Sequence, residues 1–255
     1  MLKALIFDVD GTLADTEKDG HRVAFNLAFK AANLSWHWNE RCYGDLLAVT
    51  GGKERMRFYA EQYDPAFLAQ KNAHQIIIDL HARKTRYYVE LLSQGKIPLR
   101  PGVERLLNEA RAAKLTLAIA TTTTPENVTA LIENTLGAAA MNWFQCIGAG
   151  DIVPEKKPAA DIYEYVLKRL NLSAKECIAF EDSENGTLSA QGANLATIIT
   201  TNDYTLDHNF KDAVLVLNQY GEANNPATVI TGKMTKPYLD LASIRAIHEA
   251  KCPAI

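Results

Sequence analysis

The sequence has no excess of basic residues and no long hydrophobic run. Its 255 residues contain 27 lysines and arginines against 30 aspartates and glutamates, for a net charge of −3. A nucleic-acid surface needs a concentrated positive charge, so we expect no nucleic-acid partner. The apolar stretches fall far short of the roughly 20 residues that cross a bilayer. We therefore expect no membrane partner either.

Cysteine is scarce as well. Cys42, Cys146, Cys177 and Cys252 are scattered, without the paired spacing of a zinc site or a redox motif. Isolated cysteines of this kind fit a reducing compartment, where most of them are small core residues. The N-terminus also lacks the basic start and apolar middle of a secretory signal. Together these absences predict a cytoplasmic protein.

What is present is an ordinary globular composition. Hydrophobic residues make up 47% of the chain and charged residues 22%. A chain of this length can bury a full core and can form one large domain or two smaller ones.

The stretch Leu2–Leu13 is the most informative part of the chain. Its short apolar run Ala4–Phe7 predicts a buried strand, because it is too short for a helix. Asp8 and Asp10 follow, and alternate side chains of an extended chain point to the same side. Two close carboxylates raise each other's pKa unless a cation neutralises them, and Mg²⁺ prefers such oxygen ligands. Gly11 then lets the chain turn sharply beneath the pair.

Two simpler interpretations of this stretch exist. One is an acidic turn after a strand, without function. The other is a calcium-binding EF-hand loop starting at Asp8. Its sixth and twelfth positions need glycine and glutamate but hold Leu13 and Asp19, so this interpretation is disfavoured. A functional pair is favoured because matching groups follow three further strand ends.

The pattern changes from helical to alternating along the chain. Asp15 to about Gly95 is helical, with a glycine turn at Thr50–Arg55 leading into a helix, and a long helix from about Ala66 to Leu92. From Arg100 onward strands and helices alternate. The predicted strands are Leu115–Ala120, Phe144–Ile147, Cys177–Phe180, Leu195–Ile199 and Val214–Leu217, the last being the final strand of the sheet.

Alternating apolar strands and helices predict a parallel sheet covered on both faces. The predicted fold class is α/β, with a Rossmann-like parallel sheet core formed by residues 1–14 and 96–221. An all-helical cap domain, residues 15–95, is inserted after the first strand. Residues 222–255 are a C-terminal extension with a short amphipathic helix after Pro237. We expect this helix to pack on the core, and an oligomer contact is the alternative.

The strand ends carry groups that suit a phosphate. Ligands of open parallel sheets sit beyond the carboxyl ends of the strands. After the second strand, Thr121-Thr122-Thr123-Thr124 offers hydroxyls and N–H groups just before a helix, which suits an anion. Glu155-Lys156-Lys157-Pro158 supplies a cation, and Glu181-Asp182-Ser183 returns carboxylates for a metal. Each motif alone is commonly a turn, a loop or a helix start, but their order at strand ends argues against coincidence.

With these motifs in this order, the sequence resembles haloacid-dehalogenase-superfamily phosphatases that have a helical cap after the first strand. The resemblance covers residues 1 to roughly 220 and is strongest to CbbY-type sugar-bisphosphate phosphatases, then to β-phosphoglucomutases. It rests on the opening stretch and the strand-end motifs. It also rests on Thr16-Glu17 to His21-Arg22, on Thr50-Gly51-Gly52-Lys53-Glu54-Arg55 and on His81-Ala82-Arg83-Lys84-Thr85.

The resemblance implies a role for each strand-end group. Asp8 would be the nucleophile that forms an aspartyl-phosphate. Asp10 would be the general acid for the leaving alcohol and then the base for water. Thr121 and the backbone of Thr122 would hold the phosphoryl oxygens, and Lys157 would neutralise charge. Such a carboxylate nucleophile splits one difficult step into two.

The resemblance also implies a Mg²⁺ cofactor. The ion would be bound by the carboxylates of Asp8 and Asp182 and by the main-chain carbonyl of Asp10, with Glu181 acting through a water. Phosphoryl transfer then depends mostly on positioning and on charge stabilisation by the metal and the lysine.

The cap would select the substrate. Lys84 interrupts an apolar stripe of the long helix, either as a lysine reaching solvent at the edge or as one directed toward a second phosphate. Gly51, Gly52 and Lys53 are either a plain turn or, with Arg55, a second anion site. Glu17 and His21 are either ligands of sugar hydroxyls or surface residues.

The leading interpretation is a Mg²⁺-dependent phosphatase for a small sugar phosphate, by resemblance xylulose-1,5-bisphosphate. A mutase similar to β-phosphoglucomutase is the nearest alternative, because the two differ in how well the closed cap excludes water. A catalytically silent sugar-phosphate sensor would usually lack Asp8, Asp10 or Lys157, and none is missing. We expect a monomer or a weak homodimer.

Overall fold

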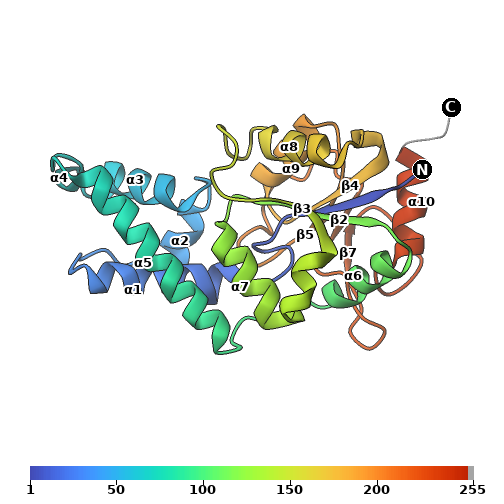
Figure 1. The fold of residues 1–255 in the computed structure, drawn as a ribbon, viewed down its shortest axis with the longest axis horizontal. Helices are drawn as coiled ribbons and strands as arrows, with labels where there is room; N and C mark the ends of the chain where they lie inside the picture. The colour runs from blue at the N-terminus through green and yellow to red at the C-terminus, as the bar shows by residue number, and fades with distance from the viewer. Residues whose placement is uncertain (252–255) are drawn as a thin grey trace.

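The computed structural model describes residues 1–251, so Cys252 lies outside the described residues. Figure 1 shows a sheet covered by helices, and a separate group of helices projecting from one end of it, on the left of the view. The N-terminus and the last helix lie at the opposite end. The predicted α/β class with a helical cap is therefore confirmed. No helix in the described residues is long and apolar enough to cross a membrane.

A seven-stranded sheet forms the centre of the larger part. Its strand order is β3-β2-β1-β4-β5-β6-β7, and all neighbouring pairs are parallel except β6 with β7. The order changes direction beside β1, which is where doubly wound sheets bind ligands. The strands are β1 (Ala4–Phe7), β2 (Thr116–Ala120), β3 (Phe144–Gly148), β4 (Cys177–Glu181), β5 (Ala196–Thr200), β6 (Leu215–Leu217) and β7 (Val229–Thr231).

The prediction that Val214–Leu217 is the last strand is wrong. A further strand, β7, lies in the C-terminal extension and pairs antiparallel with β6, with Leu217 opposite Val229. The run from Thr228 to Thr231 is β-branched, which favours a strand. Because β7 has only three residues and all are exposed, it lacks the buried alternation that identifies strands from sequence.

Helices cover both faces of the sheet, as a parallel sheet requires. Leu5 and Phe7 of β1 face one hydrophobic cluster, and Ala4 and Ile6 face another. The first cluster is covered by α6 (Val103–Ala112), α7 (Pro125–Leu136) and α10 (Leu241–Lys251), and the second by α8 (Asp161–Leu170) and α9 (Glu184–Gly192). Ile244 of α10 is fully buried in the first cluster, so the C-terminal helix packs on the core.

The projecting helices form the cap and have a hydrophobic cluster of their own. It contains many aromatic side chains, among them Phe25, Phe29, Trp36, Trp38 and Tyr43. The cap elements are η1 (Glu17–His21), α1 (Arg22–Ala31), α2 (Glu40–Leu46), α3 (Gly52–Tyr63), α4 (Pro65–Leu68) and α5 (Ala73–Ser93).

The prediction of one long helix from Ala66 to Leu92 is wrong at its start. Asp64 caps the short helix α4 by accepting from the Phe67 N–H, and α5 begins only at Ala73. The intervening alanine, glutamine and lysine are good helix formers, so their propensity did not reveal the break.

Two linkers connect the cap with the sheet and run side by side. Ala14 and Leu99 form an antiparallel bridge, and the Arg100 N–H donates to the Leu13 carbonyl at 2.9 Å. The domain boundaries at 15, 95 and 221 stay predictions.

Candidate active site

The predicted strand-end groups converge at the carboxyl end of the sheet, under the cap. A cavity of about 210 Å³ lies there. Of the predicted site residues, it is lined by Asp8, Asp10, Glu17, Arg55, Thr121, Thr122, Lys157, Glu181 and Asp182. An adjoining cavity of about 50 Å³ is lined by His21, Gly51, Gly52 and Lys84, together with Asp10 and Arg55. Lys53 lines neither of these two cavities.

Backbone pairing places the acid pair. The Asp8 N–H donates to the Phe180 carbonyl at 2.9 Å, so β1 stays paired with β4 up to the first aspartate. Gly11 then turns the chain with φ of 81°. A Cβ at Gly11 would lie 2.2 Å from Oδ2 of Asp182, so only glycine allows this close approach. The turn therefore brings the acids after β1 against the acids after β4.

Lys157 binds two of these carboxylates at once. Its Nζ donates to Oδ1 of Asp8 and to Oε1 of Glu181, each at 2.6 Å, and to the Ala120 carbonyl at 2.9 Å. Tyr163 also donates to Oε1 of Glu181 at 2.6 Å. Burial alone would lower the pKa of Lys157, but its ion pairs with Asp8 and Glu181 raise it above the usual range. The lysine therefore stays charged.

The cluster still carries an excess of negative charge. Oxygen atoms of Asp8, Glu181 and Asp182 all lie within 4.8 Å of one another, and the three residues are buried. Burial raises the pKa of Asp8 to about 8, against the effect of Lys157, and Glu181 and Asp10 add to the rise. Burial and the charges of Asp8 and Glu181 raise the pKa of Asp182 well above its usual range.

A divalent cation fits this cluster. When all three carboxylates are ionised, they and the lysine carry a charge of −2, which an ion such as Mg²⁺ would balance. The donors are all oxygens, as Mg²⁺ prefers. Oδ2 of Asp182 also accepts from the Asn202 amide at 2.7 Å, which fixes the orientation of that carboxylate.

Asp10 is held by groups from the cap side. Its Oδ1 accepts from the Thr16 hydroxyl at 2.5 Å and lies 2.8 Å from Nε2 of His21. Lys84 Nζ lies 2.7 Å from Nδ1 of the same histidine. Because an ammonium only donates, Nδ1 accepts and the Nε2–H donates to Asp10. Burial alone would raise the pKa of Asp10, but His21 and Thr16 hold it well below its usual range.

Lys84 is a buried cation. Its side chain lies near the rings of Phe25 and Tyr88, 4.9 and 5.3 Å from Nζ to the ring centres. Burial lowers its pKa to about 8, although Asp10 and Glu17 oppose the shift. Of the two interpretations left open for Lys84, the structure therefore has the lysine directed into the cleft.

A hydrogen-bonded trio forms the cap wall of the larger cavity. The Tyr43 hydroxyl donates to Oε2 of Glu17 at 2.5 Å and accepts from Arg55 at 2.8 Å. Arg55 also lies over the Tyr43 ring, 5.1 Å from its centre. The tyrosine thus fixes both predicted cap residues relative to each other.

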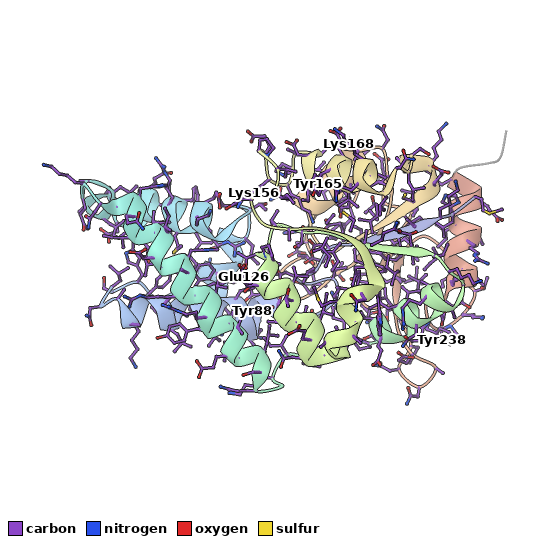
Figure 2. All side chains as sticks on the ribbon, in the orientation of Figure 1. Tyr88, Glu126, Lys156, Tyr165, Lys168 and Tyr238 are labelled. Atoms are coloured by element: carbon purple, nitrogen blue, oxygen red, sulfur yellow. The ribbon has the colours of Figure 1, made fainter. Side chains whose placement is uncertain are left out.

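The first turn of α3 contacts the sheet part through charged groups. Lys53 lies 2.5 Å from Asp151, and Lys156 bridges Asp151 at 2.8 Å and Glu54 at 3.2 Å. Figure 2 labels Lys156 at the junction of the two parts. Lys53 thus forms an ion pair across the junction, beside a third cavity of about 220 Å³ that Gly52 and Thr122 also line.

Thr121 and Thr122 follow β2 and line the cavity of about 210 Å³ that contains the acid pair. Thr121 is buried, and its hydroxyl accepts from the Thr123 N–H at 3.3 Å. Thr124 caps α7 by accepting from the Asn127 N–H, with Pro125 at the first helical position.

Among the residues that hydrogen-bond to the predicted site groups, Tyr43, Tyr163 and Asn202 were not predicted from the sequence. Tyr43 lies in α2, where no motif marks it, and Tyr163 reads as an ordinary core position of α8. Asn202 follows β5, and a polar residue after a parallel strand is a signal that could have identified it.

Comparison with known proteins identifies relatives over most of the chain. A family model described as haloacid dehalogenase-like hydrolase matches residues 2–194. The plasmid CbbY protein of Cupriavidus necator is 44% identical over 247 residues, which cover 97% of each chain. CbbY of Rhodobacter capsulatus is 48% identical over 212 residues, which cover 83% of this chain and 91% of the relative.

Comparison with solved structures identifies CbbY proteins as well. CbbY from Rhodobacter sphaeroides in complex with phosphate matches with a TM-score of 0.81 at 42% identity, covering 87% of this chain and 96% of that one. A mutant of that protein in complex with xylulose-1,5-bisphosphate matches with a TM-score of 0.80 at 41% identity, over 88% and 96%. A β-phosphoglucomutase from Clostridium difficile shares the fold, with a TM-score of 0.74 at 20% identity over 98% and 99%. The chain therefore belongs to the haloacid dehalogenase-like hydrolases, and within them to the CbbY-type phosphatases.

Proposed function

We propose that this phosphatase is Mg²⁺-dependent and removes one phosphate from a small sugar bisphosphate through an aspartyl-phosphate on Asp8. Xylulose-1,5-bisphosphate is the leading substrate, since a CbbY relative has been solved with it. The observation that carries the proposal is Lys157, which binds Asp8 and Glu181 together at 2.6 Å at the floor of a cavity that cap residues close.

Asp8 has the surroundings of a nucleophile. It lines the cavity, and Lys157 opposes the rise of its pKa, so the lysine favours the reactive carboxylate. Attack of its free oxygen on phosphorus would form the acyl-phosphate bond and break the bond to the sugar oxygen. Thr121 and Thr122 line the same cavity and would donate to the phosphoryl oxygens.

The Mg²⁺ ion would be held by Asp8, Asp182 and the main-chain carbonyl of Asp10, with Glu181 acting through a water. When bound, it would neutralise the charge that develops on the transferred phosphoryl group. Glu181 already accepts from Lys157 and Tyr163, which suits an indirect role.

Asp10 is placed for proton transfer. Thr16 and His21 hold its carboxylate in one orientation. Its low pKa keeps Asp10 ionised, which is the form that can accept a proton from water when the aspartyl-phosphate is hydrolysed. A phosphoryl dianion bound beside Asp10 would raise its pKa, which would let it carry the proton that the leaving sugar oxygen needs.

The cap supplies the charge for a second phosphate. Lys84 and Arg55 are buried cations at the smaller cavity, and Gly51 and Gly52 line it with backbone. Glu17 faces the larger cavity, where a carboxylate would accept from sugar hydroxyls. Lys53 is engaged with Asp151, so we assign it a place at the rim of this site.

Phosphate release from a panel of sugar monophosphates and bisphosphates tests the proposal. We expect the highest kcat/KM for a ketopentose bisphosphate, and complete loss of activity in excess chelator, restored by Mg²⁺. Incubation with glucose 1-phosphate should release phosphate and yield no isomerised sugar phosphate. Activity that persists unchanged in chelator, or isomerisation without phosphate release, contradicts the proposal.

A further inference from the structure

Arg100 is a buried arginine whose guanidinium donates hydrogen bonds to four backbone carbonyls. It lies in the linker that returns from the cap, and only 5% of its side chain is exposed. One guanidinium nitrogen, Nη1, donates to the Gly11 carbonyl and to the Thr200 carbonyl at 3.2 Å. The other, Nη2, donates to the carbonyls of Thr201 at 2.5 Å and Asn218 at 2.6 Å.

The guanidinium therefore joins segments that are far apart in the sequence. Gly11 belongs to the turn after β1, Thr200 is the last residue of β5, Thr201 follows it, and Asn218 follows β6. Nε of Arg100 lies 3.4 Å from Oδ1 of Asp15, at the start of the linker into the cap. An arginine presents five N–H donors in a planar fork, and a lysine cannot reproduce that pattern.

The turn held by Arg100 carries the acid pair. Its Gly11 carbonyl faces the guanidinium, while the Gly11 Cα packs so closely against Asp182 and Asn202 that a Cβ would overlap both side chains. The turn is thus fixed from two sides. A shift of the Gly11 peptide would displace Asp10, its covalent neighbour, and with it Asp8.

We propose that Arg100 is a positioning residue that holds the Asp8–Gly11 turn in register with Asp182 across the catalytic cavity. The expected effect on catalysis rests on the proposed phosphatase function. The effect of Arg100 on the position of the turn is independent of that function.

A matched pair of variants separates positioning from general stability. Arg105 of α6 also donates to buried carbonyls, those of Gly221 at 2.8 Å and Leu239 at 3.0 Å, and lies over the ring of Tyr238, which Figure 2 labels. It lines none of the cavities around the acid pair. Arg100→Lys and Arg105→Lys each keep the charge and lose the fork.

We expect Arg100→Lys to lower kcat by roughly 10- to 100-fold with little change in KM, because small displacements of reacting groups cost rates of this order. Arg105→Lys should keep the wild-type kcat. In hydrogen exchange of the full chain, amides of residues 8–14 and 200–202 should exchange faster in Arg100→Lys. Those near 221 and 239 should exchange faster in Arg105→Lys.

Guanidinium rescue provides a second readout. Arg100 lines a cavity of about 460 Å³ between the linkers and the ends of β5 and β6, so added guanidinium ion can reach its position. In Arg100→Ala, guanidinium should raise kcat several-fold, and methylammonium should not. Arg100→Gln replaces the lysine variant if the latter does not fold.

Three outcomes decide the matter. Wild-type exchange rates at residues 8–14 in Arg100→Lys overturn the inference whatever the activity. So does an equal loss of kcat in Arg105→Lys. If the wild-type protein hydrolyses no phosphate ester, the proposed function fails, while the exchange comparison still judges the placement of the turn.

Discussion

The two sides of the catalytic cleft are built on opposite charges. On the sheet side, Asp8, Glu181 and Asp182 outnumber Lys157, so the strand ends require a cation. The cap side contributes Lys84 and Arg55 at the smaller cavity against one carboxylate, Glu17, so its cations are in excess there.

The two sides also differ in what holds their side chains in place. The sheet-side groups bind one another and follow strands whose backbone pairing fixes them. The cap groups are held by aromatic packing in addition to hydrogen bonds. The ring centres of His21 and Tyr88 lie 4.0 Å apart, and Arg55 lies over the Tyr43 ring. Under the proposed function, the sheet side determines the reaction and the cap side determines the substrate. Substitutions on the two sides should therefore affect different kinetic constants.

The largest effect is expected on the sheet side. Asp8→Asn keeps the shape of the proposed nucleophile and removes its reactivity, so kcat should fall by roughly 10⁴-fold or more, the order seen when a nucleophile is removed. Substrate binding should persist in calorimetry. Asp19→Asn, which changes an exposed acid of η1, is the control and should keep the wild-type kcat. Residual hydrolysis near the wild-type rate would remove Asp8 from its role.

On the cap side, Lys84→Met should raise KM by roughly 10- to 100-fold, because a hydrogen bond to a charged group contributes about 1.5–3 kcal/mol. The melting temperature should not fall, since burial disfavours the charged lysine. An unchanged KM, or a clear loss of stability, would assign Lys84 to the structure of the cap.

The pH dependence of binding follows from the same lysine. Lys84 has a pKa of about 8, so it is charged below pH 8 and neutral above it. Binding of an anionic substrate should therefore weaken as the pH rises through 8, which is read from kcat/KM. Lys84→Arg keeps its charge at high pH, so this fall should be absent in that variant.

A smaller effect is expected at the hydrogen-bonded trio. Tyr43→Phe removes the hydroxyl that Glu17 and Arg55 share, and KM should rise by roughly tenfold with kcat nearly unchanged. Tyr59→Phe alters another ring of the cap cluster and serves as the control. A fall in kcat with constant KM would move Tyr43 from substrate recognition to the chemistry.

The smallest effect is expected at the junction. Asp151→Asn breaks the ion pairs with Lys53 and Lys156. The side chain of Asp151 is more than half exposed. Exposed pairs contribute about 0–1 kcal/mol and are screened by salt. KM should rise at most about fivefold, and the difference from wild type should vanish in high salt. A large, salt-independent loss would mean that Lys53 acts on substrate.

Much of the sheet side could be predicted from the sequence, because its groups directly follow recognisable strands. The spacing of Asp8 and Asp10 after a short apolar run already places both at one sheet edge. The cap side was less predictable. Tyr43 donates a hydrogen bond to Glu17, which lies 26 residues away in the sequence. Packing of the aromatic cluster positions Tyr43 for this bond, and no local sequence pattern encodes it. The break before α5 and the strand β7 were missed because short elements leave little periodicity.

The strand β7 changes what the sheet offers to other molecules. Without it, β6 would present its unpaired backbone along a buried, apolar border. The tail instead closes that border with three exposed residues in antiparallel pairing. An edge strand of three residues offers few unpaired N–H and C=O groups to a second sheet, and short edge strands are one way in which proteins limit edge-to-edge association.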